Sequence, residues 1–269
     1  VVIRAAHGGS AAARNVGIAS AKGDILLFTD ADCVPSPNWI ARMVEPFKDP
    51  KVVGTKGTYR TRQCALIARL TQLEFEIRYQ RMRRFRYIDF IDTYAAAYRK
   101  EILTTAHGFN TAYVAAEDVE LSFRLAQAGH RMVFVPEAWV WHLHPATLSS
   151  YLRRKMRFGY WRALLYAQLP EKISGDAHTD PMLKPQFGLL AVALGFGVGA
   201  FVYHPLAYVA YALLGLFFVT TLPFVRWAWS RDRTVALAWP GVTFLRVLLQ
   251  GTTLGAGFVL HKIRPSQSS

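Results

Sequence analysis

The sequence is poor in cysteine and in acidic residues. Cys33 and Cys64 are its only cysteines in 269 residues, too few for a disulfide framework, and no Cys/His pair has the spacing of a zinc site. A reducing compartment is the simplest fit. Asp and Glu together number 18 against 32 Lys and Arg, which gives a formal net charge of +14. This surplus indicates an anionic partner, whether nucleic acid, a phosphorylated substrate or a lipid surface.

Charged residues are missing altogether from one long stretch. Residues 185–225 form a run of 41 residues without Asp, Glu, Lys or Arg, whereas a membrane helix needs about 20. The run therefore predicts two transmembrane helices, 187–203 and 206–225. Three arginines follow between residues 226 and 233, which predicts a cytoplasmic loop and, with two crossings, a cytoplasmic N-terminal domain. Residues 235–260 are also apolar; whether they span the membrane or lie at its interface stays open.

The composition argues against a disordered basic tail. Hydrophobic residues make up 52% of the chain, aromatic residues make up 13%, and the mean hydropathy is +0.15. These values favour a membrane-associated protein. The chain begins Val-Val-Ile-Arg, without an initiator Met or a signal-peptide pattern. Because residues 1–3 have the composition of a strand inside a sheet, we expect an N-terminal piece to be missing from this sequence.

The order of apolar runs and turn residues predicts an α/β layer fold. Short runs typical of strands alternate with helical periodicity through the first part of the chain. We expect strands at residues 1–4, 25–29, 52–59, 131–135 and 138–141. We expect helices at residues 11–21, 36–48, 63–87, 117–129 and 148–169, followed by a polar linker at 169–185.

Two carboxylates follow the predicted strand at residues 25–29. Asp30 and Asp32 stand where that strand should end. In an open α/β sheet, ligands bind at the carboxyl ends of the strands, so this strand end is a candidate site. Two acids on an irregular strand end can both turn toward one hard cation, and Mg²⁺ or Mn²⁺ prefers such oxygen ligands. The alternative is a pair of solvated turn acids.

A second acidic pair stands at the start of a predicted helix. Glu117 and Asp118 fall in the first turn of the helix at residues 117–129. Acids at this position complement the helix dipole without any chemistry, which is the structural alternative to a catalytic role. His142 and His144 follow the last predicted strand, either as metal ligands or as loop imidazoles.

Arginine is concentrated in two predicted helices. Residues 78–86 carry five arginines, and residues 153–161 interleave cations with aromatic rings. Two explanations of the first cluster are equally good: a solvated helix face, or contact with anionic headgroups or a phosphorylated acceptor. The second cluster suits a diphosphate or a membrane interface. No recognised nucleic-acid motif accompanies this charge, so we expect no nucleic-acid partner.

Four segments, in this order, resemble the family 2 glycosyltransferases of the GT-A fold, of the membrane-anchored bacterial type. The resemblance covers residues 1–161. The first segment is Ala13-Arg14-Asn15-Val16-Gly17-Ile18 with Ala21-Lys22-Gly23-Asp24, which is similar to the family's "ARNxGI…AxGD" run. The second is Asp30-Ala31-Asp32, similar to the family's DXD metal motif, and the third is Glu117-Asp118, similar to its "ED" pair. The fourth is Arg154-Lys155-Met156-Arg157-Phe158, which stands where QXXRW occurs in processive members.

The resemblance implies a fold class and a division into domains. It implies an α/β GT-A domain, a Rossmann-like transferase of nucleotide-diphospho-sugars, at residues 1–146, without its first strand and base-binding part. A basic helix and linker at 147–186 and transmembrane or interface helices at 187–262 would follow. The implied location is the cytoplasmic membrane, with the catalytic domain on its cytoplasmic side.

The resemblance also implies which residues hold the donor. Asp32, assisted by Asp30 and completed by His142, would bind Mg²⁺ or Mn²⁺. The expected contacts to the nucleotide-diphosphate sugar are Arg14, Asn15, Asp30, Arg154 and Arg157.

The implied reaction is inverting transfer of the sugar to a lipid-linked or cell-envelope glycan acceptor. Asp118 is the expected general base, Glu117 the second candidate, and Asp92 would orient the acceptor. Arg154 and Phe158 replace the Gln and Trp of the fourth motif, which favours a single addition over processive synthesis. The alternative function is a membrane-tethered, catalytically incomplete nucleotide-sugar-binding or assembly component. A phosphohydrolase is disfavoured, because the sequence does not show the nucleophilic Asp with a distant Lys that it requires.

Overall fold

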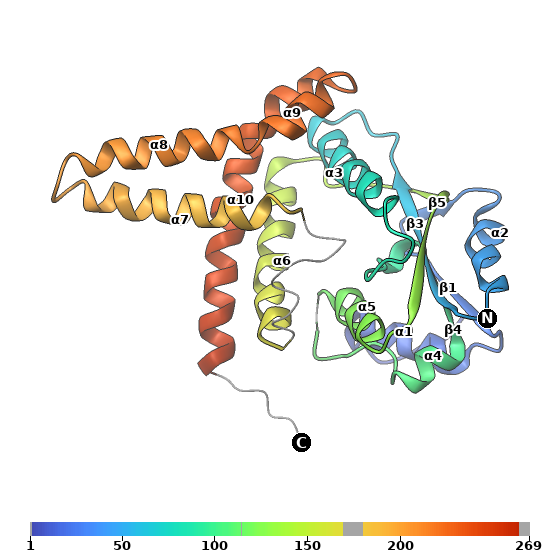
Figure 1. The fold of residues 1–269 in the computed structure, drawn as a ribbon. Helices are drawn as coiled ribbons and strands as arrows, with labels where there is room; N and C mark the ends of the chain where they lie inside the picture. The colour runs from blue at the N-terminus through green and yellow to red at the C-terminus, as the bar shows by residue number, and fades with distance from the viewer. Residues whose placement is uncertain (1, 114, 169–179, 264–269) are drawn as a thin grey trace. The chain divides into compact units, whose positions relative to one another are not determined.

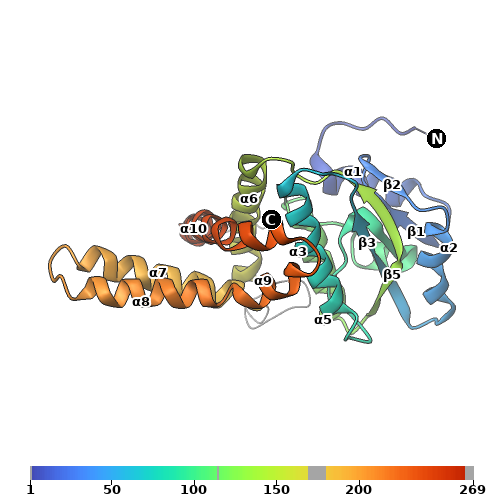
Figure 2. The same cartoon turned by 90° about the horizontal axis from the view of Figure 1, so that it is seen from above.

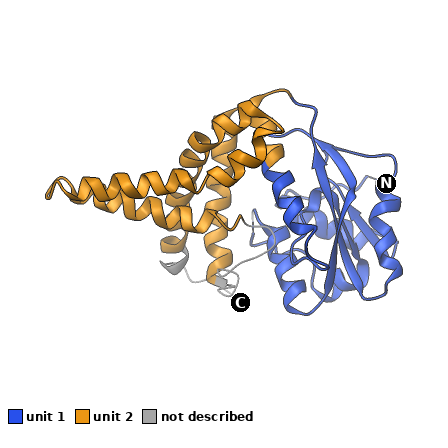
Figure 3. Cartoon of the chain, turned by 45° about the horizontal axis from the view of Figure 1, so that its top comes forward, with its two compact units in different colours: residues 1–63, 74–144, 176–178 blue, residues 64–73, 145–175, 179–269 orange. Residues whose placement is uncertain are grey.

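The computed structural model describes residues 2–113, 115–168 and 180–263, and the chain divides into two compact units. The first unit comprises residues 1–63 and 74–144, with 176–178; the second comprises 64–73, 145–175 and 179–269 (Figure 3). Both acidic pairs belong to the first unit, and the predicted transmembrane helices belong to the second. The division into three domains stays a prediction.

The first unit is built on a five-stranded mixed sheet. Its strands are β1 (Ile25–Phe28), β2 (Cys33–Pro35), β3 (Val52–Arg60), β4 (Ala96–Arg99) and β5 (Arg131–His142), in the order β1-β4-β3-β5-β2. β3 and β5 are parallel, and the other pairs are antiparallel. The strand that leads to the Asp pair, β1, therefore lies at an edge of the described sheet.

Helices cover both faces of this sheet. The elements are α1 (Gly9–Ser20), α2 (Trp39–Val44), α4 (Lys100–Thr105) and α5 (Glu117–Gln127), with 3₁₀ turns at Glu45–Lys48 and Thr93–Ala95. α3 (Leu66–Met82) begins in the second unit and ends in the first. In both views α2 lies on one side of the sheet and α5 on the other (Figures 1 and 2). One hydrophobic cluster includes Tyr98, Leu121 and Met132, and another includes Met43 and Val140, so each layer is packed on the strands.

Two strand predictions were wrong. Residues 2–8 form no strand, and Val2 and Ile3 are exposed, because no described strand pairs with this segment. The two short strands predicted at 131–135 and 138–141 are one strand, β5, which continues through Pro136. The register with β3 shifts between Lys56 and Thr58, so the residues around Pro136 form a bulge in which its missing N–H is not needed for the ladder.

The second unit is helical. Its elements are α6 (Leu148–Gln168), α7 (Leu183–Gly199), α8 (Leu206–Val219), α9 (Leu222–Trp229) and α10 (Arg233–Ile263). α6 and α10 approach closely where Gly159 faces α10, because a Cβ at Gly159 would lie 2.5 Å from Thr253 Oγ1. The Thr253 hydroxyl also donates to the Met156 carbonyl, 2.9 Å away. The predicted linker lies, at residues 169–179, outside the described residues.

Two described helical segments are long and apolar enough to cross a membrane, by length and composition. They are Leu206–Trp229 and Arg233–Leu260; Leu183–Gly199 is a shorter apolar helix. For the second segment, the sequence left open whether it spans the membrane or lies at its interface. The helix in this segment, α10, continues through Pro240. The finding favours a membrane anchor, while the number of crossings and their orientation stay predictions.

Candidate active site

The Asp-X-Asp segment forms a tight turn between β1 and β2. The backbone N–H of Cys33 donates to the Asp30 carbonyl, 3.0 Å away, which closes the turn. The turn leaves both acids accessible, with side chains 38% exposed for Asp30 and 57% for Asp32. The structure thus places both carboxylates at the end of β1, where the sequence predicted them.

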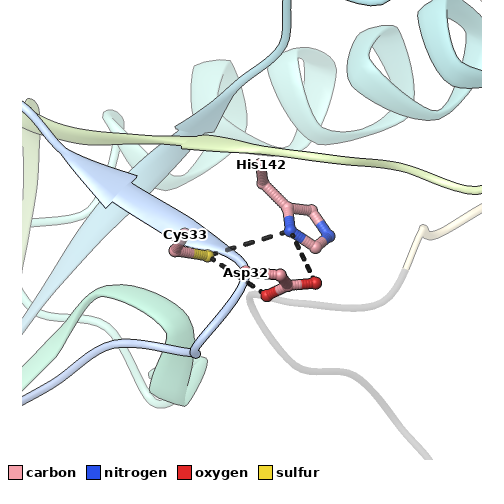
Figure 4. A group of neighbouring side chains, drawn as sticks. All are labelled: Asp32, Cys33 and His142. Carbon is pink, nitrogen blue, oxygen red and sulfur yellow. Dashed lines mark hydrogen bonds and ion pairs between the residues drawn. The ribbon is translucent and has the colours of Figure 1, made fainter.

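Asp32, Cys33 and His142 come together beside this turn. Cys33 on β2 is paired in register with His142 at the end of β5, so the antiparallel ladder brings the two side chains together. His142 Nδ1 lies 3.5 Å from Asp32 Oδ2 and 3.8 Å from Cys33 Sγ (Figure 4). Burial, together with the charges of Asp30 and Asp32, raises the pKa of the Cys33 thiol to about 12, so the thiol is protonated at neutral pH. The cluster therefore offers one carboxylate and one imidazole, with their atoms within 4.8 Å of one another.

The imidazole of His142 is held in place by aromatic rings and by the backbone that follows it. Its ring stacks on Tyr59, with centroids 4.3 Å apart, and Tyr59 in turn stacks on Tyr94. The side chain of Gln63 then binds His144 at two points: Gln63 Nε2 donates to the His144 carbonyl at 2.9 Å, and the His144 N–H donates to Gln63 Oε1 at 2.6 Å. These contacts fix the direction in which the His142 ring points.

Gln63→Leu is expected to destabilise this strand end. The substitution leaves the His144 N–H and carbonyl without their side-chain partner in a part-buried place, a loss of about 1–3 kcal/mol in the free energy of unfolding. Chemical denaturation of the detergent-purified protein measures it. Gln63→Glu keeps an oxygen that accepts the His144 N–H but sets a second carboxylate oxygen against the His144 carbonyl, so it should destabilise the strand end as well. Equal stability of Gln63→Leu and the parent would contradict the two-point contact.

Arg14 links the Asp-X-Asp turn to the second acidic pair. From α1, its Nη1 lies 2.6 Å from Glu117 Oε1 and its Nη2 lies 3.3 Å from Asp30 Oδ1. The Ser10 hydroxyl donates to the same Glu117 oxygen at 2.6 Å. Segments far apart in the sequence thus meet through one guanidinium, and the start of α5 lies beside the end of β1.

Asp118 follows Glu117 in the first turn of α5. The helix is entered through Ala116, whose φ of 77° turns the chain so that both acids begin the helix. Asp118 is half-buried, and one carboxylate oxygen accepts the Val119 N–H at 2.8 Å. Burial, and then the neighbouring Glu117 charge, raises the pKa of Asp118 to about 6, against the lowering effect of Arg14 and Lys56. Its carboxyl group therefore changes charge close to neutral pH.

A buried ion pair under this site was missed by the sequence analysis. Lys56 on β3 is fully buried, and its ammonium group pairs with the carboxylate of Asp92. The ammonium also lies 4.7 Å from the centroid of the Phe90 ring. Burial and the nearby Arg78 lower the pKa of Lys56, while Asp118 raises it. Asp92 is itself buried, and its role toward an acceptor stays a prediction.

The remaining predicted donor contacts are Asn15, Arg154 and Arg157. Asn15 holds the backbone of Phe109: its Nδ2 donates to the Phe109 carbonyl at 2.8 Å, and its Oδ1 accepts the Phe109 N–H at 2.8 Å. Both polar atoms of the Asn15 side chain therefore form hydrogen bonds within the protein. Arg154 and Arg157 lie on α6 in the second unit, where the Arg154 guanidinium covers the Phe158 ring. Their part in donor binding stays a prediction.

Comparison with known proteins places this chain in a family. A family model described as "Glycosyltransferase like family 2" matches residues 1–160, more than half of the chain. The chain belongs to this family. That result confirms the predicted family, and the turn with Asp30 and Asp32 and the start of α5 fall within the matched region.

Two curated relatives of this chain are also glycosyl-transferring enzymes by name. The chain is 28% identical over 200 residues to the pre-mycofactocin glycosyltransferase of Mycobacterium tuberculosis, covering 71% of this chain and 41% of the relative. It is 26% identical over 156 residues to the poly-beta-1,6-N-acetyl-D-glucosamine synthase of Staphylococcus aureus, covering 56% of this chain and 38% of that protein. The chain thus spans less than half the length of these relatives.

One similar solved structure is a mannosyltransferase from Pyrobaculum calidifontis in complex with GDP-Man and Mn²⁺. It matches 96% of this chain and 68% of its own, with a TM-score of 0.50 and 19% sequence identity. At this identity the likeness concerns the fold. Together with the family match, it confirms that the first unit has the GT-A fold.

Proposed function

We propose that this chain transfers a sugar from a nucleotide-diphosphate donor to an acceptor hydroxyl, with inversion and with a divalent cation. One observation carries the proposal: Arg14 binds Asp30 and Glu117 together, so the Asp-X-Asp turn and the acid-bearing start of α5 form one site. A transferase of this kind needs positive charge for the departing diphosphate and a base for the incoming hydroxyl. Both occur within this group of residues.

The residues at the turn fit a divalent cation. Asp32 and His142 present an oxygen and a nitrogen in reach of one ion, and Asp32 is accessible from solvent. Carboxylate ligands suit Mg²⁺ and Mn²⁺, and the similar mannosyltransferase structure contains Mn²⁺. When bound, the ion would act as a Lewis acid that neutralises the diphosphate leaving group. Asp30, held by Arg14, is the further oxygen on the same turn.

The group that removes the proton from the acceptor lies at the start of α5. Asp118 can take the proton of an acceptor hydroxyl, because its carboxylate is available above pH about 6. Glu117 is less suited, since its Oε1 already accepts from both Arg14 and Ser10. Arg14 then has two effects: it holds Glu117 in place and keeps a positive charge next to Asp30.

The acceptor we infer is lipid-linked or part of a cell-envelope glycan, at the cytoplasmic face of a membrane. Its support is the pair of apolar segments in the second unit, long enough to hold the chain at a bilayer. Arg154 and Arg157 on α6 are proposed to bind the donor diphosphate.

A donor-hydrolysis assay on the purified chain tests the proposal. With a panel of nucleotide-diphosphate sugars, we expect release of the nucleoside diphosphate with Mn²⁺ or Mg²⁺, and its loss when the ion is chelated and restored by re-addition. Turnover that persists in chelator would contradict the metal role. Calorimetric binding of the nucleoside diphosphate without any turnover would instead support the catalytically incomplete binding component.

A further inference from the structure

The last part of β5 presents a row of apolar side chains on one face of the sheet. Ala138, Val140 and His142 are buried, whereas the alternating positions, Trp139 and Trp141, are half-buried. Successive side chains of a strand point to opposite faces, so the tryptophans share the face opposite to the buried residues. Their rings are in contact, with centroids 4.9 Å apart. Leu143 follows in the same alternation and is 68% exposed.

The row continues across the neighbouring strands. Trp141 is paired in register with Val34 on β2 and with Arg60 on β3, and paired residues lie on the same face. Val34 is 62% exposed. We call the surface made by the following residues the tryptophan face: Val34, Arg60, Arg62, Trp139, Trp141 and Leu143. β3 and β5 lie side by side in both views (Figures 1 and 2).

Two exposed arginines give the tryptophan face its charge. The Arg60 guanidinium lies 4.5 Å from the Trp139 ring centroid, and that of Arg62 lies 4.2 Å from the Trp141 centroid. No carboxylate among the described residues forms an ion pair with either arginine. A guanidinium stacked on a ring keeps its N–H edge available to an anion. The face is therefore apolar and cationic at once.

The tryptophan face is separate from the candidate active site. Cys33 and His142 form the register pair next to Val34 and Trp141, so their side chains point to the other face of the sheet. A partner on the tryptophan face would leave Asp32 and His142 uncovered. The charge on this face also lies outside the donor site, because neither arginine contacts Asp30 or Glu117.

We propose that the tryptophan face binds the headgroup region of a membrane rich in anionic lipid. Tryptophan is enriched where bilayer and water meet, because its ring is apolar and its N–H is polar. Exposed Val and Leu enter the boundary between headgroups and acyl chains, and arginine binds the phosphates of anionic lipids. Each arginine near an anionic surface strengthens binding about fivefold. The first unit thus has a lipid contact of its own, independent of the apolar helices of the second.

A fluorescent reporter of depth tests this contact in the full chain. Leu143→Cys, in a Cys64→Ser background, takes an environment-sensitive label, since Cys33 is buried. The chain is placed in nanodiscs of phosphatidylcholine with or without phosphatidylglycerol. We expect a blue shift and quenching by spin-labelled lipid only in the discs that contain phosphatidylglycerol. A label on exposed Thr104→Cys in α4 should show neither change.

Matched charge variants separate lipid binding from general charge. Arg60→Gln with Arg62→Gln should abolish the quenching at position 143 that depends on phosphatidylglycerol. Lys48→Gln with Lys51→Gln removes two exposed cations outside the face and should leave the quenching unchanged. The proposal is overturned if the labels at positions 143 and 104 respond alike. Quenching that is equal in both kinds of disc, or that survives the arginine substitutions, also overturns it.

Discussion

Asp32→Asn is expected to lower the rate of donor turnover on the order of 10³-fold, the largest effect of any single change at the turn. The substitution keeps the shape of the side chain and removes the charge that would hold the cation next to His142 Nδ1. Without the cation, only the arginines would be left to balance the charge of the departing diphosphate. Steady-state kinetics with saturating Mn²⁺ measure the loss, and electron paramagnetic resonance of Mn²⁺ measures the weakened binding separately.

Asp49→Asn is the matched control for Asp32→Asn. Asp49 is an exposed turn acid whose Oδ1 accepts the Lys51 N–H at 2.9 Å, and an asparagine oxygen can accept the same bond. Its turnover should equal that of the parent. Full activity of Asp32→Asn, or unchanged Mn²⁺ affinity, would refute the assignment of the cation to this turn.

The parts of the site that local sequence determines were the parts that could be predicted. Asp30 and Asp32 follow an apolar run closed by a turn, and Glu117 and Asp118 begin an amphipathic helix; both signals lie within a dozen residues. The family motifs then placed the two pairs in one site, and Arg14 provides the physical link.

The parts that depend on distant contacts could not be predicted. Lys56 stands in an alternating strand, where a lysine normally faces solvent, and only its pairing with Asp92 shows why it is buried. The contact of Gln63 could not be predicted from the sequence, because its partner is the backbone of His144, far along the chain. Cys33 joined the site through the register of β2 with β5, and register is a long-range property.

The strand errors have the same origin. A β-rich composition at residues 1–4 predicts a strand only if another strand is there to pair with it. Pro136 suggested a break between two strands, whereas the structure absorbs it in a bulge opposite Gly57. A Cβ at Gly57 would lie 2.2 Å from the Ala138 carbonyl oxygen, so only glycine permits this close approach. Such a compensation between two strands is not visible in either segment alone.

Asp118→Asn is expected to lower turnover to an acceptor by about 10²–10⁴-fold, the usual contribution of a general base. The amide keeps the shape of the carboxylate but cannot take a proton. In the parent, kcat/KM should fall tenfold for each pH unit below about 6 and level off above it, because the pKa of Asp118 is raised to about 6 and the ionised form is the active one. A pH profile from weakly acidic to weakly basic buffer measures this.

The substitution Glu117→Gln distinguishes the role of Glu117 from that of Asp118. Removing the Glu117 charge takes away one of the causes that raise the pKa of Asp118, so the acidic limb of the profile should move to lower pH. The neutral amide replaces the carboxylate that forms an ion pair with Arg14, and the loss of this ion pair lowers stability, which thermal unfolding reports independently. If Glu117→Gln abolishes turnover while Asp118→Asn retains it, the base is Glu117, and the raised pKa of Asp118 reflects only its burial beside a like charge.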